Sequence, residues 1–312
     1  MAITVVGSIA FDAVKTPFGE RERMLGGAAV HFALAASFFD VVRIVGPVGE
    51  DFGEAELDVL RGRGIDVSDI EHVPGGRTFF WRGEYGWDLN SRETLDTQLN
   101  VFEHFAPKLS PASRASEVLF LANIQPALQL AVRRQCHDTR FTALDSMNLW
   151  IDVARDSLIE AINEVDCVIL NDAELRQLTA KPNLLSAAQE LISWGPGGRR
   201  CVVAKLGEYG AALITPTGYF SIPAFPLETV VDPTGAGDSF AGGFVGYIAC
   251  QRPGSRLTPA LLRRAMAYGT ALASFNVEAF GTERVERLTF PEIAERVAHL
   301  RRMTTFSLEP KG

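Results

Sequence analysis

The sequence contains no apolar run of the ~18 residues that a membrane-spanning helix needs, and it begins without the basic and apolar segments of a secretory signal. Its 30 Lys and Arg side chains are outnumbered by 38 Asp and Glu, which gives a formal net charge of -8. Binding to a nucleic-acid backbone depends on clustered cations, so this charge disfavours nucleic acid as a partner. We therefore expect a cytoplasmic protein that binds neither nucleic acid nor a membrane.

Cysteine is scarce as well, with four in 312 residues: Cys136, Cys167, Cys201 and Cys250. Cys167 and Cys201 lie in apolar, strand-like segments, where a reduced cysteine behaves as a small hydrophobic side chain. This pattern favours core thiols over disulfides or a cysteine metal site. The five histidines show no metal-ligand spacing, so zinc is not expected.

The three-glycine turn of dinucleotide-binding folds is also absent. The first strand-like run ends in Gly7, Ser8, Ile9 and Ala10 instead. A dehydrogenase of that type is therefore excluded.

Apolar strand candidates alternate with helical stretches along most of the chain. The strands lie near residues 117, 141, 166, 201 and 211, and the helices near 53–63, 126–136, 151–163, 184–194, 237–250 and 258–276. Three of the strand segments lack polar alternation, as parallel strands covered on both faces do. The pattern predicts one α/β domain over residues 1–312, built on a doubly wound sheet.

One region departs from this alternation. From about residue 67 to 101 the sequence is β-prone and rich in aromatic residues, with no crossover helix nearby. It is either an edge hairpin of the main sheet or a small lid that excludes water from a substrate. We expect a lid formed by residues from about 12 to 25 and from about 67 to 101.

The most informative segment covers residues 232–244 and reads DPTGAGDSFAGGF. Gly235, Ala236 and Gly237 allow backbone N–H groups to converge at a helix N-terminus, which favours an anion such as a phosphoryl group. Asp238 falls in the first helical turn, where its carboxylate is suited to accept a proton from an attacking hydroxyl. A glycine turn before an Asp-capped helix would look similar, so the glycines alone do not decide.

The complete segment resembles the signature of the ribokinase-like (PfkB) carbohydrate kinases, and the resemblance extends over most of the chain. It implies an ATP-dependent phosphotransferase with a three-layer doubly wound sheet and a small β-strand lid. In that family the last aspartate of the motif is the catalytic base, and the preceding amides form an anion hole. These roles fall on Asp238 and on Gly235, Ala236 and Gly237.

Further matches concern the acceptor substrate. Asp12 resembles the family's aspartate that binds substrate hydroxyls, and Gly26 and Gly27 resemble the glycine pair that lines the same pocket. Four residues beyond the second glycine the family usually has an asparagine, whereas this chain has His31. Histidine can still bind a hydroxyl, but it is equally consistent with a helix residue satisfied by a neighbouring group.

Other matches concern the nucleotide. Asn171 and Glu174 resemble the family's Asn-x-x-Glu element, which helps to hold metal and phosphates, although the same spacing also forms a helix capping pair. Lys205, Gly207 and Gly210 resemble the turn at which the family binds nucleotide, although a simple hairpin would look the same.

The resemblance also implies cofactor contacts. Asn276 lies in the part of the chain that closes over the adenine in the family, and we expect it to contact the nucleotide there. Glu174 is expected to bind Mg²⁺ through water, because magnesium prefers oxygen ligands and keeps several waters. Asp232 falls where many members of the family bind a monovalent cation, so the sequence leaves potassium open.

The leading interpretation is an ATP- and Mg²⁺-dependent kinase that phosphorylates an alcohol group of a sugar or sugar-like molecule. Five aromatic residues of the lid segment leave a ribonucleoside open as the substrate, as in an adenosine-like kinase: Phe79, Phe80, Trp81, Tyr85 and Trp87. The same aromatic surface is compatible with a homodimer formed through the lid. A ligand-binding homologue without catalysis is the third alternative.

Overall fold

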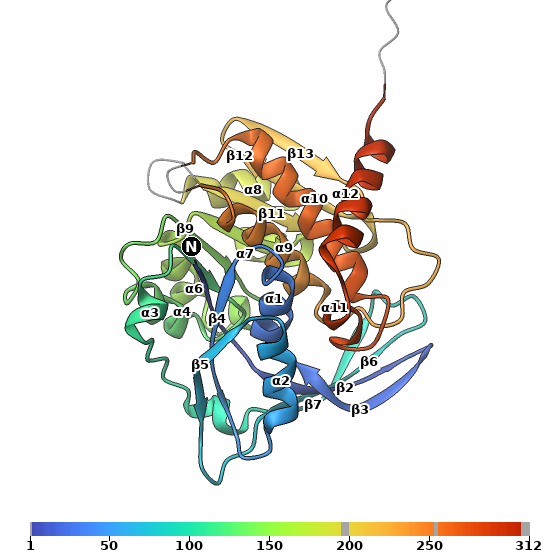
Figure 1. Cartoon of the computed structure of the whole chain (residues 1–312). Coiled ribbons are helices and arrows are strands. Elements are labelled where there is room, and N and C mark those ends of the chain that lie inside the picture. Colours follow the sequence, from blue (N-terminus) through green and yellow to red (C-terminus); the bar gives the residue numbers. More distant parts are fainter. Residues whose placement is uncertain (1, 195–199, 253–254, 307–312) are drawn as a thin grey trace, which may run out of the picture.

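A nine-stranded sheet forms the centre of the molecule in a computed structural model that describes residues 2–194, 200–252 and 255–306 (Figure 1). The strand order is β13-β12-β11-β10-β9-β8-β1-β4-β5. In chain order the strands are β1 (Ala2–Val6), β4 (Val41–Val48), β5 (Asp66–His72), β8 (Val118–Leu121), β9 (Phe141–Asp145), β10 (Cys167–Asn171), β11 (Cys201–Lys205), β12 (Ala211–Thr215) and β13 (Gly218–Ile222).

From β5 to β11 all neighbouring strands are parallel, whereas the pairs β11–β12 and β12–β13 are antiparallel. The chain runs from β1 to β4 and β5 on one side, and then returns to β8 and its neighbours on the other side. This reversal beside β1 makes the sheet doubly wound, as predicted. In such sheets the crevice outside the carboxyl ends of the strands, at the reversal, is where ligands bind.

Both faces of the sheet are apolar, which explains the missing polar alternation. In β8, for example, Val118 and Phe120 face one core, while Leu119 and Leu121 face the other. All four side chains are essentially inaccessible to solvent. The expected core thiols are present, because Cys136, Cys167 and Cys201 are buried, and Cys250 is half-buried.

Helices cover the two faces in separate layers (Figure 1). Helices α1, α2, α9 and α10 pack on one face, with α12 outside α10, and helices α4 to α8 lie over the other. Their bounds are α1 (Ala28–Ala36), α2 (Glu54–Gly62), α3 (Pro111–Arg114), α4 (Pro126–Arg133), α5 (Asn148–Val153), α6 (Arg155–Asn163), α7 (Asp172–Thr179), α8 (Leu184–Ser193), α9 (Ala236–Ala249), α10 (Pro259–Asn276), α11 (Glu283–Glu286) and α12 (Phe290–Thr304).

A second, four-stranded sheet projects from one end of the molecule; we call it the small sheet (Figure 1). Its order is β3-β2-β6-β7, with bounds β2 (Ala10–Thr16), β3 (Gly19–Gly26), β6 (Phe79–Tyr85) and β7 (Arg92–Gln98). The predicted lid boundary at residue 67 is wrong, since residues 66–72 form β5 and pair with β4 in the main sheet. The β-prone pattern did not reveal which of the two sheets this strand joins.

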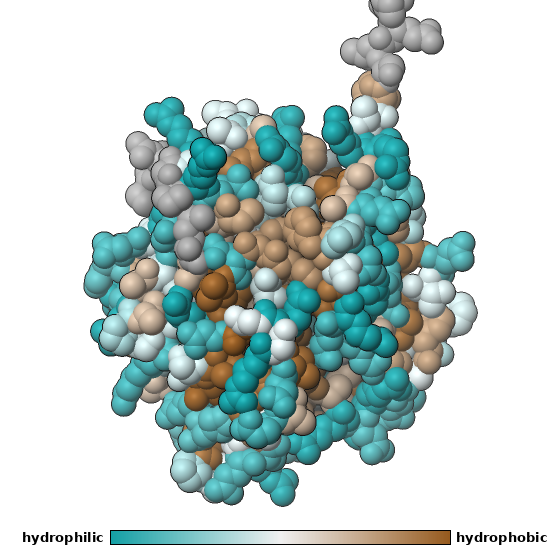
Figure 2. Space-filling model, in the orientation of Figure 1, coloured by the Kyte–Doolittle hydropathy of each residue, from teal (hydrophilic) through white to brown (hydrophobic). Residues whose placement is uncertain are grey.

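The surface is consistent with the composition. Figure 2 shows polar side chains around the margins of one face and apolar side chains gathered near its middle, over α9 and α10. Within the described parts of the chain, no helix is both long and apolar enough to cross a membrane.

Candidate active site

Polar side chains from several strands meet at the carboxyl edge of the main sheet. Asp145 ends β9, Asn171 ends β10 and Lys205 ends β11, and the N-terminus of α9 lies opposite them. Parallel strands direct their carboxyl ends to one edge, so residues distant in sequence converge there.

The N-terminus of α9 is the turn predicted from the glycine-rich segment. Gly235 is its N-cap with φ 74°, a left-handed conformation that strains any residue with a Cβ. Ala236 and Gly237 open the helix, and Asp238 lies in its first turn. The N–H groups of Gly235 and Gly237 have no partner among the described residues, whereas that of Ala236 donates to the backbone oxygen of Pro233 at 3.2 Å. Free N–H groups at a helix N-terminus suit an anion, so the anion site stays a prediction that this turn supports.

Two further glycines let α9 approach its neighbours. A Cβ on Gly242 would lie 2.5 Å from the backbone oxygen of Phe32 in α1, and one on Gly243 would lie 2.8 Å from that of Tyr268 in α10. Close packing on both sides therefore fixes α9, and with it the position of Asp238.

Lys205 binds a residue that the sequence did not reveal. Its Nζ lies 3.1 Å from Oδ2 and 3.3 Å from Oδ1 of Asp145, whose side chain is only 6% exposed. The same Nζ would lie 3.0 Å from a Cβ on Gly237, so the ammonium group is next to the first turn of α9. A polar residue directly after an apolar parallel strand was the signal that could have identified Asp145.

The surroundings of Asp238 raise the pKa of its carboxyl group. Burial, and after it the negative charge of Asp145, raises the pKa of Asp238 to about 7, although Lys205 opposes the shift. The pKa of Lys205 is raised, because Asp145, Glu174 and Asp238 together outweigh the effect of its burial. An aspartate with a pKa near neutrality is well matched to general-base catalysis.

The predicted acceptor-side residues Asp12, Gly26 and Gly27 lie together. Asp12 is in β2 of the small sheet, and a Cβ on Gly26 would lie 2.0 Å from its Oδ2. Gly27 is the N-cap of α1 with φ 97°, and a Cβ there would lie 2.5 Å from the backbone oxygen of Ser8. Burial, then the negative charge of Asp232, raises the pKa of Asp12 to about 7.

His31 lies beneath the anion site, and its side chain is inaccessible to a substrate in this structure. The residue is 3% exposed, its Nδ1 lies 3.1 Å from Oδ1 of Asn276, and its Nε2 has no partner among the described residues. A Cβ on Gly235 would lie 2.3 Å from His31 Nδ1, so the imidazole ring packs directly against that glycine.

The expected adenine contact of Asn276 is inconsistent with its position. The residue is fully buried, its Nδ2 donates to the backbone oxygen of Thr234 at 2.6 Å, and its Oδ1 accepts from Ser239 Oγ at 3.0 Å. Its amide thus holds the α9 turn, and its burial keeps it from contact with a nucleotide in this structure. Small flanking residues gave no sign that Asn276 points into the core.

Asn171 and Glu174 form the capping pair that was the second interpretation of their spacing. Asn171 Oδ1 accepts from the backbone N–H of Glu174, and Glu174 Oε2 accepts from that of Asn171, both at 2.8 Å. Asn171 is therefore occupied as an N-cap. Burial raises the pKa of Glu174; the positive charge of Lys205 opposes this shift, and the negative charge of Asp145 reinforces it. Glu174 therefore belongs with Asp145, Lys205 and Asp238 to one group of interacting charges, which we call the charged cluster.

Gly207 and Gly210 lie in the turn of the β11–β12 hairpin and have φ 58° and 99°. A Cβ on Gly210 would lie 2.1 Å from the backbone oxygen of Ile222, so packing against β13 explains that glycine without a nucleotide. A Cβ on Gly207 would lie 3.9 Å from Asn90 Oδ1, and the neighbouring Glu208 accepts a hydrogen bond from Asn90 Nδ2 at 3.3 Å. The small sheet thus contacts this turn.

Asp232 connects two loops next to α9. It is fully buried, and its two carboxylate oxygens accept from the backbone N–H groups of Thr234 at 2.9 Å and Gly281 at 3.0 Å. Among the residues that the structure describes, no group of three or more His, Cys, Asp or Glu is arranged to hold a metal ion. The potassium site stays a prediction.

The aromatic residues of the small sheet divide into two groups. Trp81 and Tyr85 pack in a cluster with Phe280 and Val231 beside the α9 turn, and Tyr85 Oη accepts from Thr234 Oγ1 at 3.2 Å. The others point elsewhere: Phe79 stacks on Phe102, Phe80 packs on the main core, and Trp87 is exposed.

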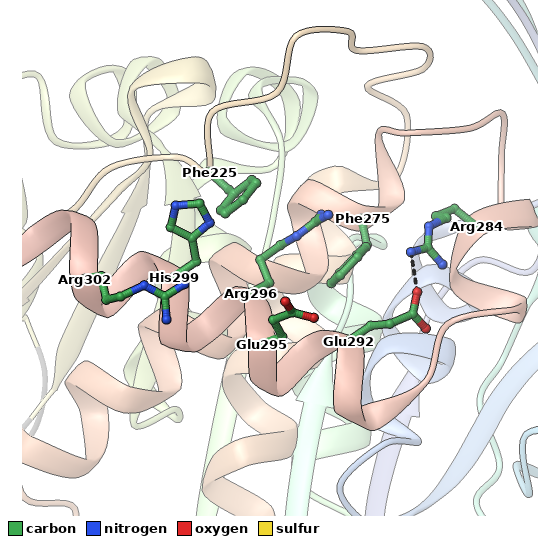
Figure 3. A pocket seen from close by; sticks show the side chains of 8 residues that line it. All are labelled: Phe225, Phe275, Arg284, Glu292, Glu295, Arg296, His299 and Arg302. Atoms are coloured by element: carbon green, nitrogen blue, oxygen red, sulfur yellow. Dashed lines mark hydrogen bonds and ion pairs between the residues drawn. The ribbon is translucent and has the colours of Figure 1, made fainter.

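A surface pocket of about 310 Å³ lies between α12 and Phe225, and no residue of the charged cluster lines it (Figure 3). Arg296 crosses it between the rings of Phe225 and Phe275 and is paired with Glu278. Arg284 is paired with Glu278 and Glu292. These pairs are a structural network that ties α12 to the fold.

A doubly wound sheet, a glycine-rich turn at a helix N-terminus and a half-buried aspartate in its first turn are the features of an ATP-dependent phosphotransferase of the ribokinase fold. The chain belongs to the pfkB family of carbohydrate kinases, whose sequence model matches residues 2–287. It is 29% identical to a cytidine kinase of Thermococcus kodakarensis over 80% of this chain and 90% of that protein.

Solved structures agree on the fold. The nucleoside kinase of Methanocaldococcus jannaschii superposes with a TM-score of 0.77 at 21% identity, covering 96% of this chain and 98% of that one. Aminoimidazole riboside kinase from Salmonella enterica, solved with aminoimidazole riboside and an ATP analogue, gives a TM-score of 0.74 at 20% identity, covering 95% of this chain and 100% of that one. The ribokinase-like architecture predicted from the sequence is confirmed.

Proposed function

We propose that this kinase transfers the γ-phosphoryl group of ATP to an alcohol group of a sugar or nucleoside, with Asp238 as the catalytic base. The observation that carries the proposal is the position of Asp238. It lies in the first turn of a helix whose N–H groups form an anion site, and it faces the ammonium group of Lys205.

In this mechanism the acceptor oxygen attacks the γ-phosphorus, and the bond to the β–γ bridging oxygen breaks, so that ADP leaves. Asp238 takes the hydroxyl proton. The N–H groups of Gly235 and Gly237 stabilise the charge on the transferred group, whereas that of Ala236 donates to Pro233 in this structure. Such charge stabilisation is where most of the catalytic effect arises in phosphoryl transfer.

Lys205 and Glu174 are assigned to the phosphate side of the site. Lys205 is held by Asp145 close to Gly237, within reach of a phosphate at the helix N-terminus. Glu174 keeps Oε1 free of the capping interaction, which suits a hydrated Mg²⁺ bound through water. When bound, the metal would neutralise phosphate charge.

On the acceptor side, we assign Asp12, which packs against Gly26 and lies beside Gly27, to accept hydrogen bonds from sugar hydroxyls. A nucleoside is the acceptor class that we test first. Trp81 and Tyr85, which pack beside the α9 turn, provide aromatic surface for a base, and the relatives described above act on nucleosides or ribosides by name.

Several broader expectations remain proposals. We infer that the chain is one domain, that the small sheet closes as a lid over the acceptor, and that a homodimer forms through its exposed strands. The contacts Asn90–Glu208 and Tyr85–Thr234 support closure, because each joins the small sheet to a segment assigned to phosphate or nucleotide. A cytoplasmic location belongs to the same group of proposals.

The test is ADP release by the purified protein with ATP and Mg²⁺ across cytidine, adenosine, inosine, ribose, fructose and a sugar acid, with Asp238→Asn as control. One strong acceptor whose turnover is lost in the variant supports the proposal and fixes the substrate class. Turnover that survives unchanged in the variant contradicts the role of Asp238. Tight acceptor binding without any phosphate transfer would favour the non-catalytic homologue instead.

A further inference from the structure

His31 is the first residue in a series of contacts that ends at the proposed anion site. His31 in α1 contacts Asn276 at the end of α10, and Asn276 contacts the peptide between Thr234 and Gly235. Both side chains are shielded from solvent: His31 is 3% exposed and Asn276 is fully buried. No acceptor molecule can reach the imidazole in this arrangement.

Hydrogen-bond chemistry fixes the orientation of each group in the chain. The backbone oxygen of Thr234 only accepts, so the side-chain nitrogen of Asn276 must face it at 2.6 Å. The amide oxygen of Asn276 therefore faces Ser239 Oγ and His31 Nδ1. Because that oxygen only accepts, His31 must carry its proton on Nδ1, and its Nε2 is an unprotonated nitrogen without a partner.

The imidazole is also neutral. Burial lowers the pKa of His31 to about 4, and the hydrogen bond to Asn276 only partly opposes this shift. A second proton would sit on Nε2, where no described residue accepts it. The residue therefore acts as a fixed donor rather than as a titrating group.

The contacts from His31 end at the Thr234–Gly235 peptide, which belongs to the proposed anion hole. A trans peptide is planar, so its C=O and N–H point in opposite directions. Holding the oxygen of Thr234 towards Asn276 consequently directs the N–H of Gly235 away from the core and towards the anion site. The imidazole ring supports the same peptide from below, since a Cβ on Gly235 would lie 2.3–2.4 Å from three of its ring atoms.

We propose that His31 is a positioning residue, which orients the Thr234–Gly235 peptide of the anion hole through Asn276 and does not contact the acceptor. This inference rests on the proposed function and corrects the substrate-binding role expected from the sequence. It explains how a histidine is accommodated where the family usually has an asparagine.

Two substitutions distinguish the roles of the two ring nitrogens of His31. In His31→Asn the side-chain amide reaches the position of Nδ1, whereas in His31→Gln it reaches that of Nε2. If Nδ1 acts on the anion hole, the Asn variant keeps kcat, while the Gln variant loses roughly 10- to 100-fold in kcat, as expected for a disturbed oxyanion donor. The KM for the best acceptor of the panel stays unchanged in both.

The opposite pattern would overturn the proposal. A direct acceptor contact through Nε2 predicts that the Gln variant retains the acceptor KM and that the Asn variant raises it. Unchanged kinetics in both variants would also overturn it. Thermal unfolding of each variant establishes that the comparison is made on folded protein.

A second measurement does not depend on turnover and so separates this inference from the proposed function. Nitrogen-15 NMR of labelled wild-type protein, with His31 assigned by its loss in His31→Gln, reports which ring nitrogen carries the proton. We expect the Nδ1–H neutral form at pH 7 and still at pH 5. An Nε2–H tautomer or an imidazolium at pH 7 would contradict the chain of contacts, whether or not any acceptor is phosphorylated.

Discussion

Lys205 Nζ lies 3.1 Å from Asp145 Oδ2 at the carboxyl edge of the sheet, in contact with the helix turn that carries Asp238. The pair holds one positive charge among three carboxylates, those of Asp145, Glu174 and Asp238, and their combined effect raises the pKa of Lys205. The cation is thereby fixed where phosphate is expected to bind.

Replacing Lys205 by Met should reduce both stability and activity. The variant leaves Asp145 buried without its partner, and breaking a buried pair in this way costs about 3–5 kcal/mol. It also removes the charge that opposes the raised pKa of Asp238, so the acidic limb of the kcat profile should move to higher pH. Chemical denaturation and a pH–rate profile measure the two effects.

The matched control is Arg61→Met, which breaks the exposed pair between Arg61 and Glu54 in α2. Exposed pairs contribute little, so this variant should match the wild type in both measurements. If Lys205→Met and Arg61→Met behaved alike, the pair at the sheet edge would have no special role.

The pH dependence of catalysis should follow Asp238. Burial raises its pKa to about 7, and only the ionised carboxylate accepts the proton of the acceptor. We expect kcat, which reports on the enzyme with acceptor bound, to fall about tenfold for each pH unit below this value. A flat profile down to pH 5 would mean that no such base acts in the rate-limiting step.

Asp238→Asn should be more stable than the wild type at pH 8 while losing roughly 10²- to 10⁴-fold in kcat. The pKa of Asp238 is higher in the folded state than the unfolded value of about 3.9, so the native state binds the proton more tightly. Stability is therefore lost as pH rises from about 4 to about 7, and the neutral amide removes this loss.

Melting temperatures of the wild type and Asp238→Asn at pH 4.5 and pH 8 check this prediction. The difference should be clear at pH 8 and should shrink towards pH 4.5. The control is Asp138→Asn, because Asp138 is exposed and distant from the cluster. A variant that is destabilised at pH 8 would show that ionised Asp238 stabilises the fold.

Much of this architecture follows from sequence pattern. Strands such as Cys167–Asn171 are apolar throughout, because both faces are buried, and this alone indicates parallel neighbours covered by helices. The glycine-rich segment at 235–237 likewise predicts the turn that begins α9, with Gly235 as the N-cap and Asp238 in the first turn.

The rest depends on contacts between distant segments. Asp145 and Lys205 are 60 residues apart, and nothing in either local sequence indicates that they pair. Asn276 looked like a residue at the surface of a nucleotide site, yet it lies in the core and holds Thr234. Local pattern gives the element and its exposed or buried face, but not which partner tertiary packing brings to it.

Gly235→Ala should reduce kcat strongly with a limited loss of stability. The glycine has φ 74°, and a Cβ there would also lie 2.3 Å from the ring of His31, so the turn must shift. Misplacing one anion-hole donor costs on the order of 10²-fold or more. Steady-state kinetics of the variant measure this loss.

Gly75→Ala is the matched control, because Gly75 has φ 71° and open space around it. Both variants carry the same backbone strain of about 1 kcal/mol, but only one of them disturbs the anion site. Equal effects on kcat would mean that the strain, and not the contact with His31, is responsible.

Arg92 should influence the acidic limb of the pH–rate profile from the small sheet. It pairs across β6 and β7 with Tyr85, whose hydroxyl contacts Thr234 at the catalytic turn. Burial is the main cause of the raised pKa values of Asp12 and Glu174, and the guanidinium of Arg92 opposes both shifts. In Arg92→Gln these pKa values should rise further, so that the acidic limb of kcat/KM, to which Asp12 contributes through acceptor binding, moves to higher pH.

Arg92→Lys keeps the charge and should leave the acidic limb in place. Because Arg92 is exposed, added salt should reduce the difference between Arg92→Gln and the wild type. Because Arg92 reaches these carboxylates only from the small sheet, the shift also reports whether that sheet stays closed during turnover. An identical profile for the Gln variant at low salt would mean that the sheet is open, with Arg92 in solvent, in the rate-limiting step.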